Sequence, residues 1–359
     1  MAQNKITKGN ADRPKSVLVA RFSAIGDVAM TVPVVYSACR CYPDVRFVMV
    51  TRPAMTAIFV DAPANLDVVG VDVKNEYKGP AGMYRLVQKL VREYHIDAFA
   101  DLHNVIRTQL MGVFCRLRGI PVARINKGRA HKRALTRRNN KVMLPLISQR
   151  ARYREVFYRL GLPLTEQFNG LYDGRGKSAD SLYAAITRPK PGGMRWIGIA
   201  PFAAHAGKVY PPDLMYKVVE ALAARTDVQI FLLGSGGREQ EILESWAAQL
   251  PRTQSLAGKR YGFATELALF NHLDVMLTMD SANMHLASIA GTPTISIWGA
   301  THPYCGFKGW RQSDADMIQM PLTCRPCSVF GDRPCHRGDC LCLNGIKPEI
   351  IVARIIEKL

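Results

Sequence analysis

The sequence predicts an α/β protein with two Rossmann-like domains that face each other across a cleft. The chain has 359 residues, which at roughly 150 residues per domain is enough for two domains. Short apolar runs alternate with helix-like stretches in both halves, a pattern typical of open parallel sheets. Between the halves, residues 165–192 are polar and end in a Pro/Gly-rich run, which indicates a domain boundary.

The first half begins with a continuous apolar run over residues 16–22, which is typical of a buried parallel strand. A short loop follows, and then a helix over 28–41 with Pro33 near its first turn, where proline is tolerated. The other elements expected in this half are strands over 45–51, 66–73 and 96–102 and helices over 84–94 and 153–160.

In the second half the alternation restarts. We expect strands over 196–201, 228–233, 275–279 and 294–298, and helices over 212–224, 239–249, 265–271, 284–290 and 348–359. The predicted domains are therefore residues 1–175, with a basic loop over 121–141, and residues 190–346, with a cysteine-rich segment over 324–342. Residues 347–359 form a C-terminal helix.

Composition narrows the classes of protein further. Hydrophobic residues make up 48% of the chain, too many for a wholly disordered protein. No run approaches the roughly 18–20 apolar residues that a membrane span needs. Residues 1–14 are polar and lack the apolar segment of a secretory signal. We therefore expect a folded, cytoplasmic protein.

The charge is strongly basic: 48 Lys and Arg against 29 Asp and Glu give +19. Such an excess favours an anionic partner, either nucleic acid, an anionic membrane surface or an acidic substrate. Much of the excess lies in the basic loop: Arg124, Lys127, Arg129, Lys132, Arg133, Arg137, Arg138 and Lys141. The loop has no aromatic residue for base stacking, which counts against single-stranded nucleic acid. It either grips an anionic acceptor or is a solvated charge run.

A carboxylate, Asp27, follows Gly26 in the first strand-to-helix loop. Ligands of open parallel sheets bind beyond the carboxyl ends of the strands, so Asp27 could act there as a general base. The alternative is an N-terminal helix cap, a position that aspartate favours. The residue pattern alone leaves both interpretations open.

A second polar group follows the expected strand 275–279 and contains Asp280, Ser281 and His285. A helix start offers free N–H groups that bind phosphate, although an ordinary capped helix fits too. Lys208 follows the strand 196–201 and could neutralise a diphosphate, or it could be a solvated surface lysine. Gly234, Ser235 and Gly236 follow the strand 228–233 and form a weak phosphate or ribose signal.

Five of the nine cysteines fall in the segment 324–342. Disulfides are the less favoured explanation in a reducing cytoplasm. Cys324 and Cys327 have zinc-ligand spacing, and Cys335 and Cys342 could complete a structural zinc site. The fifth cysteine of the segment, Cys340, is not part of this predicted ligand set. Packing of reduced, buried thiols is the alternative.

Two motifs together resemble glycosyltransferase family 9, the heptosyltransferases. The stretch Arg21-Phe22-Ser23-Ala24-Ile25-Gly26-Asp27 resembles the opening loop of that family. The stretch Asp280-Ser281-Ala282-Asn283-Met284-His285-Leu286, followed by Gly291-Thr292-Pro293, resembles its nucleotide-sugar motif. Asp101, Leu102, His103 and Arg107 fall where the family has a further cleft segment. The resemblance covers residues 17–355.

The resemblance implies a GT-B fold and inverting, metal-independent transfer of heptose from ADP-heptose to the lipopolysaccharide inner core. It makes Asp27 the general base, Lys208 the diphosphate ligand and Asp280 the sugar contact. Ser281, Ala282 and His285 would surround the phosphates, and Asn283 would belong to the same donor site. The chain departs from the family at Ala203 and Ala204, where hydroxyl residues are common, and at Ala282, where glycine is common.

The resemblance implies an anionic acceptor, the lipopolysaccharide core, which the basic residues could bind. Asp101, His103, Arg107, Arg129, Lys132 and Arg133 are the residues expected to bind it. The same positive charge could contact the inner face of the membrane peripherally. No nucleic-acid partner is then expected. The alternatives are another nucleotide sugar or surface-polysaccharide acceptor and, in a different class, a nucleic-acid-binding protein.

Overall fold

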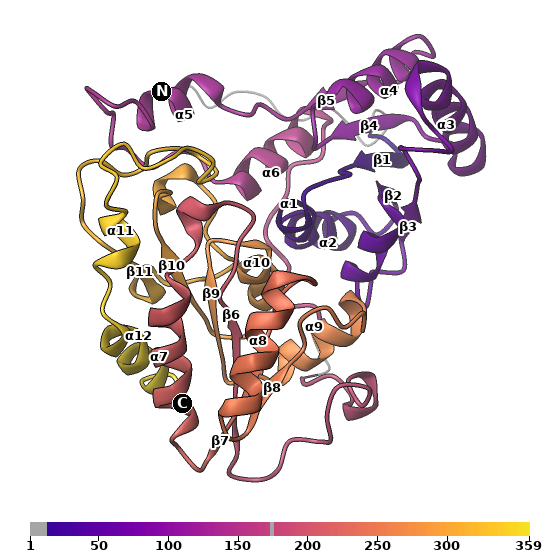
Figure 1. The fold of residues 1–359 in the computed structure, drawn as a ribbon. Coiled ribbons are helices and arrows are strands. Elements are labelled where there is room, and N and C mark those ends of the chain that lie inside the picture. Colours follow the sequence, from indigo (N-terminus) through magenta and orange to yellow (C-terminus); the bar gives the residue numbers. More distant parts are fainter. Residues whose placement is uncertain (1–12, 173–175) are drawn as a thin grey trace. The chain divides into compact units, whose positions relative to one another are not determined.

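A computed structural model describes residues 13–172 and 176–359, which form two compact units (Figure 1). The first unit contains the residues up to Ser23, Thr31–Lys127 and Arg150–Phe168. The second contains Ala24–Met30, Gly128–Gln149 and the residues from Asn169 onward. The chain therefore does not divide at one boundary, and residues 128–149, with most of the basic loop, belong to the second unit. The predicted absence of a secretory signal concerns residues 1–14, of which only Arg13 and Pro14 are among those described.

The first unit is built on a parallel five-stranded sheet in the order β3-β2-β1-β4-β5. Its strands are β1 (Ser16–Ala20), β2 (Arg46–Thr51), β3 (Leu66–Gly70), β4 (Ala98–Asp101) and β5 (Val122–Arg124). All five residues of β1 are buried, as expected of a central parallel strand covered on both faces.

Helices cover both faces of this sheet: α2 (Val32–Cys41), α3 (Gly79–Tyr94), α4 (Ile106–Arg116) and α6 (Gln149–Arg159), with a 3₁₀ turn over Pro53–Ile58. On one face, Leu86 of α3 and Met111 of α4 join the core formed by Leu18 and Phe99 of the sheet. On the other face α6 packs against β2, where the ring centroids of Phe47 and Phe157 are 6.3 Å apart.

The second unit holds a parallel six-stranded sheet in the order β11-β10-β9-β6-β7-β8. Its strands are β6 (Arg195–Ala200), β7 (Val228–Leu232), β8 (Thr253–Ser255), β9 (Val275–Met279), β10 (Thr294–Trp298) and β11 (Met317–Gln319). Sheet order and helical connections match those of a Rossmann-like domain, so the predicted fold class of two such domains is confirmed.

Its helices are α1 (Ile25–Ala29), α5 (Arg129–Leu135), α7 (Pro212–Ala223), α8 (Arg238–Gln249), α9 (Phe263–His272), α10 (Ala282–Ile289), α11 (Leu341–Asn344) and α12 (Pro348–Ile356). Short 3₁₀ turns lie over Asp180–Leu182, Ala206–Lys208, Pro303–Cys305 and Asp314–Asp316. α7, α8 and α12 bury Val218, Leu243 and Ile351 against Ile199 and Leu277 of the sheet. The C-terminal helix is thus part of this core, and Figure 1 shows α12 beside α7.

Two predictions of local structure were wrong. The single helix expected over 28–41 is two helices, α1 and α2, because Pro33 has no N–H to continue a helix and occupies the first turn of α2 instead. The basic loop is not irregular throughout, since it contains β5 and the helix α5. Helix α4 was not predicted.

Among the described residues, no helix is long and apolar enough to cross a membrane.

Candidate active site

Three neighbouring strands of the second sheet end beside one another. Strand β6 pairs with β9 on one side and β7 on the other, all in parallel, so their carboxyl ends share one edge. The loop after β6 carries Lys208, the loop after β7 carries Gly234–Gly236, and the loop after β9 carries Asp280. This is the edge where open α/β sheets bind ligands. The structure thus brings the predicted donor-site residues to one sheet edge.

Lys208 and Asp280 form an ion pair with 2.9 Å between Nζ and Oδ2. The Lys208 side chain is 16% exposed and that of Asp280 is 5% exposed, so the pair is largely withdrawn from water. Lys208 is therefore not a solvated surface lysine. The pair fixes the position of the Lys208 ammonium, and the Asp280 carboxylate offsets part of its charge.

Glycines let neighbouring segments close around the Lys208 side chain. The carbonyl of Gly207 accepts a hydrogen bond from Ala300 N at 2.8 Å, and a Cβ on Gly207 would lie 2.7 Å from the Gly331 carbonyl oxygen. Gly331 has a φ of 75°, and a Cβ there would lie 2.7 Å from Lys208 Cγ. The segment containing Gly331 therefore packs along the lysine stem and fixes its direction.

Helix α10 begins directly after Asp280. Ser281 is its N-cap residue, in an extended conformation, and its side chain makes no hydrogen bond to the α10 backbone. Its hydroxyl instead lies 3.1 Å from the Thr278 hydroxyl. The Ser281 side chain therefore leaves the first N–H groups of α10 to other acceptors, and the helix dipole adds positive potential at this end.

The short helix α1 packs against α10, within the same unit. A Cβ on Gly26 would lie only 2.8 Å from His285 Cδ2 and 3.4 Å from Ala282 Cα, so only glycine allows this approach. Asp27 is the next residue and is partly exposed. Its Oδ2 atom lies 3.4 Å from the Ala24 N–H, a long contact for a capping hydrogen bond. The helix that carries Asp27 is thus fixed against the 280–285 motif.

Two residues of the glycine loop after β7 are already in contact with helix α8. Ser235 N donates a hydrogen bond to Glu239 Oε2 at 2.7 Å, and a Cβ on Gly234 would lie 2.8 Å from Leu243 Cδ1. Packing and capping of α8 therefore account for Gly234 and Ser235. A contact from Gly236 or its neighbours to a donor stays a prediction.

Asp101 lies at the end of β4 in the first unit, and its side chain is fully buried. It accepts hydrogen bonds from His103 N at 3.0 Å and Asn104 N at 2.7 Å, and it lies 3.3 Å from Arg124 Nε. These contacts hold the turn after β4. The geometry thus favours a positioning role for Asp101 over direct contact with an acceptor.

His103 is buried against the residues that follow β1. Its Nδ1 lies 3.4 Å from Phe22 N, and its Nε2 lies 3.4 Å from the Ser23 hydroxyl. Burial lowers the pKa of His103 to about 3, and the nearby cation Arg21 contributes to the same shift. His103 is therefore neutral at pH 7 and serves as a hydrogen-bonding group. Arg107 is exposed in the first turn of α4.

The other predicted acceptor residues lie on α5 in the second unit. Arg129 and Arg133 are exposed, and Lys132 places its Nζ 4.7 Å from the Phe307 ring centroid and 6.0 Å from that of Phe330. These cation–π contacts orient α5. The predicted acceptor set is thus divided between the two compact units, with Asp101, His103 and Arg107 in the first.

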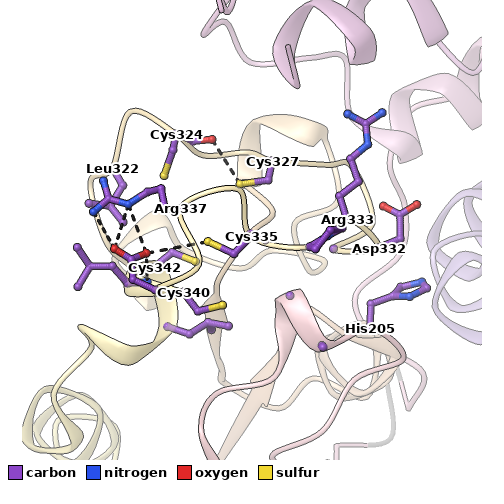
Figure 2. Close-up of a pocket in the computed structure, with 18 residues that line it drawn as sticks. His205, Leu322, Cys324, Cys327, Asp332, Arg333, Cys335, Arg337, Cys340 and Cys342 are labelled. Atoms are coloured by element: carbon purple, nitrogen blue, oxygen red, sulfur yellow. Dashed lines mark hydrogen bonds and ion pairs between the residues drawn. The ribbon is translucent and has the colours of Figure 1, made fainter. Parts of the chain in front are cut away.

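The cysteine-rich segment surrounds a pocket of about 300 Å³ in the second unit (Figure 2). The cysteines that line it are Cys324, Cys327, Cys335, Cys340 and Cys342. All are free thiols. Within residues 13–172 and 176–359, no three Cys, His, Asp or Glu side chains are grouped closely enough to hold a metal ion. Zinc binding by this segment stays a prediction.

Two basic residues organise this region: Arg325, which the sequence analysis did not single out, and Lys141, which it placed in the basic loop without this role. The guanidinium of Arg325, 1% exposed, donates to the backbone carbonyls of Gly299, Met320, Trp298 and Thr301. The ammonium of Lys141 donates to the carbonyls of Cys324 and Pro326. Apart from Met320, the carbonyls that they contact lie far away in sequence, so no local pattern could have revealed these contacts. They tie the cysteine-rich segment to the end of β10 and to the basic loop.

The family model described as glycosyltransferase family 9 (heptosyltransferase) matches residues 83–334. Lipooligosaccharide heptosyltransferase 2 of Campylobacter jejuni is 22% identical over 92% of this chain and 95% of its own length. Lipopolysaccharide heptosyltransferase 1 of Pseudomonas aeruginosa is 25% identical over 87% of this chain and 85% of its own.

Among solved structures, an Escherichia coli heptosyltransferase with ADP has a TM-score of 0.65 and 16% identity. The match covers 96% of this chain and all of that one. A family 9 glycosyltransferase of Veillonella parvula has a TM-score of 0.70 and 15% identity, over 96% and 97% of the two chains. These likenesses support the GT-B fold.

Proposed function

Because the chain belongs to glycosyltransferase family 9, we propose that it transfers heptose from ADP-heptose to the inner core of lipopolysaccharide. The observation that carries this proposal is the packing of α1, with Asp27, against the start of α10, at the sheet edge where Lys208 and Asp280 pair. The heptosyltransferases of similar sequence support the choice of sugar and acceptor.

The reaction begins at the acceptor. A sugar hydroxyl is a weak nucleophile at neutral pH, so Asp27 accepts its proton as the oxygen attacks the anomeric carbon. The new C–O bond forms while the bond from the anomeric carbon to the diphosphate oxygen breaks, and ADP leaves with that electron pair. One displacement inverts the anomeric centre and needs no covalent enzyme intermediate.

The leaving diphosphate gains negative charge as the bond breaks. Lys208 and the first N–H groups of α10 lie at the sheet edge where this charge would develop. Fixed cations and oriented N–H groups stabilise a transition state without reorganising. In this proposal Lys208 and α10 take the role that a metal ion has in other transferases. Asp280 holds Lys208 in place and contacts the donor sugar.

The acceptor side uses the basic residues. Arg107 and the α5 residues Arg129, Lys132 and Arg133 attract the anionic groups of the lipopolysaccharide core, with His103 as a neutral hydrogen-bonding partner. Asp101 positions the turn after β4 that carries His103 and leads to Arg107. The proposal includes a cytoplasmic location and a peripheral contact with the inner membrane, where such an acceptor is made.

A structural zinc ion in the cysteine-rich segment is a further part of the proposal. Thiols are strong zinc ligands, and five of them line one pocket. Cys324, Cys327, Cys335 and Cys342 would hold the ion, and they would have to move closer together to do so, since no three such side chains among the described residues are grouped closely enough for a metal. Its contribution would be to the stability of the segment that packs on Lys208, not to the chemistry of transfer.

Purified protein, ADP-heptose and a lipopolysaccharide acceptor lacking the heptose test the proposed function. We expect heptosylated acceptor and ADP in equal amounts, detected by mass spectrometry. Turnover only with a different nucleotide sugar, or only with a different surface-polysaccharide acceptor, would overturn the assignment of substrates. The proposal would be overturned entirely if this protein transferred no sugar and instead bound nucleic acid with a steep salt dependence.

A further inference from the structure

Helix α4 exposes an apolar stripe to solvent. Ile106 is 75% exposed, Val113 46% and Leu117, which follows the last helical residue, 78%. Spacings of seven and four residues place these side chains within about 40° of one another around the helix axis. The opposite side of α4 contributes Met111 and Cys115 to the core of the first unit. Helix α4 is therefore apolar on both faces.

The stripe is bordered by cations and an aromatic pair. Arg107 and Arg116 are exposed beside it, and no acidic residue occurs between Ile106 and Gly119. Toward the carboxyl end of α4, the ring of Tyr84 on α3 contacts Phe114 edge-on, with 5.3 Å between the ring centroids. The Arg118 guanidinium lies 5.3 Å from the Tyr84 ring centroid.

We propose that this stripe is a membrane-docking surface and that its partner is an anionic lipid bilayer. Apolar side chains flanked by arginine and tyrosine are the features of helices that lie in the plane of a membrane interface. The apolar groups would enter the acyl boundary while the guanidinium groups contact lipid phosphates. Each basic residue near an anionic surface adds to the attraction.

The charges disfavour a second copy of this chain as the partner. A two-fold contact through α4 would bring the arginines of both copies together without an acid from the same stretch to pair with them. A bilayer rich in anionic lipid supplies the missing negative charge. The arginines that border the stripe are therefore complementary to lipid phosphate and not to a second copy of the same surface.

Helix α4 directly follows the turn that is proposed to bind the acceptor, so docking through α4 would serve the transfer reaction. This part of the inference rests on the proposed function. The turn held by Asp101, with His103, leads directly into Ile106 and Arg107. A lipid-anchored acceptor presents its sugars at the bilayer surface. Docking through α4 would hold the acceptor-binding loop at that surface.

Vesicle sedimentation tests the proposal without any transfer reaction. Full-length protein is mixed with phosphatidylglycerol-containing vesicles or with pure phosphatidylcholine vesicles at about 0.1 M salt. We expect binding to the anionic vesicles only. V113S/L117S should weaken it about tenfold and Arg116→Gln about fivefold. Ile350→Ser, at an apolar residue 54% exposed on α12, is the matched control and should bind as the wild type does.

Equal binding of wild type and V113S/L117S, or no binding of wild type to anionic vesicles, would overturn the inference. So would a wild-type dimer in solution that Leu117→Ser dissociates, since that would give the stripe to a second copy. Transfer to a deacylated acceptor, which needs no bilayer, separates the two proposals. V113S/L117S should keep near wild-type turnover there, whereas failure of the wild type in that assay would concern the proposed function alone.

Discussion

Lys208 and Asp280 face each other across 2.9 Å at the ends of two neighbouring strands, β6 and β9, and both side chains are largely buried. In sequence, the loops that carry them are separated by the elements from α7 to β9. Their pairing keeps a cation at the sheet edge before any anionic ligand arrives. An incoming diphosphate would then meet a positioned charge rather than a mobile one.

Replacing Lys208 should damage both stability and donor binding. Lys208→Met leaves the Asp280 carboxylate buried without its cation, which costs about 3–5 kcal/mol of unfolding free energy. ADP affinity should fall at least about tenfold, since a charge-assisted contact is lost. Thermal denaturation and calorimetric titration with ADP measure the two effects.

The double variant K208M/D280N separates them. Removing both charges should restore part of the stability but none of the ADP affinity. If K208M/D280N instead binds ADP as tightly as the wild type, Lys208 is a structural residue only.

Substituting Gly26 tests the contact between α1 and α10. Gly26→Ala places a Cβ 2.8 Å from the His285 ring, so α1 must move away from α10. We expect a stability cost of about 1–3 kcal/mol and a loss of transfer of about tenfold or more, with ADP binding retained. Gly192→Ala is the control, because a Cβ there has no neighbour within 4 Å. Equal activity of both variants would show that the position of α1 does not matter for transfer.

Glu266 should make stability fall as the pH rises. Burial raises the pKa of this carboxyl in α9 from 4.5 to about 7. Between these values the folded protein keeps a proton that the unfolded chain has lost, so the stabilisation is complete below pH 4.5 and is lost as pH rises through 7.

Glu266→Gln should remove this dependence and stabilise the protein at pH 8 by about 3 kcal/mol, as measured by urea denaturation at several pH values. Glu220→Gln, on the exposed side of α7, should leave the profile unchanged. A profile for Glu266→Gln that parallels the wild type would disprove the effect.

Metal analysis decides between zinc and plain thiols in the cysteine-rich segment. We expect about one equivalent of zinc in protein purified without chelator, and a lower melting temperature after its removal. C324S/C327S should abolish the zinc, whereas Cys39→Ser, at a buried cysteine of the first unit, should not. Less than a tenth of an equivalent in the wild type would leave reduced thiols as the explanation.

The sequence predicted the principal strands because each is a continuous buried run, such as Val275–Met279. It missed α4, whose apolar residues face both the core and solvent, so no single stripe marks the helix. It treated the residues of α5 as a loop because Arg129, Lys132 and Arg133 fall within a longer run of basic residues. It also merged α1 with α2, although Pro33 marked the second start.

The candidate site was predictable in part. Strand order brings Lys208 and Asp280 to one edge, as alternating strands and helices implied. Their ion pair, the four carbonyls around Arg325 and the approach of Gly26 to His285 are tertiary contacts, and no local pattern encodes them. Asp101 was predicted as an acceptor ligand, yet its burial and backbone hydrogen bonds favour a positioning role.

The most direct test of the catalytic account is heptose transfer by Asp27→Asn under saturating donor and acceptor. Asparagine keeps the size of the side chain but cannot accept the hydroxyl proton. We predict that kcat falls by about 10²–10⁴-fold while the Kd for ADP changes less than about twofold. Turnover within a few-fold of the wild type would contradict the role of Asp27 as the base.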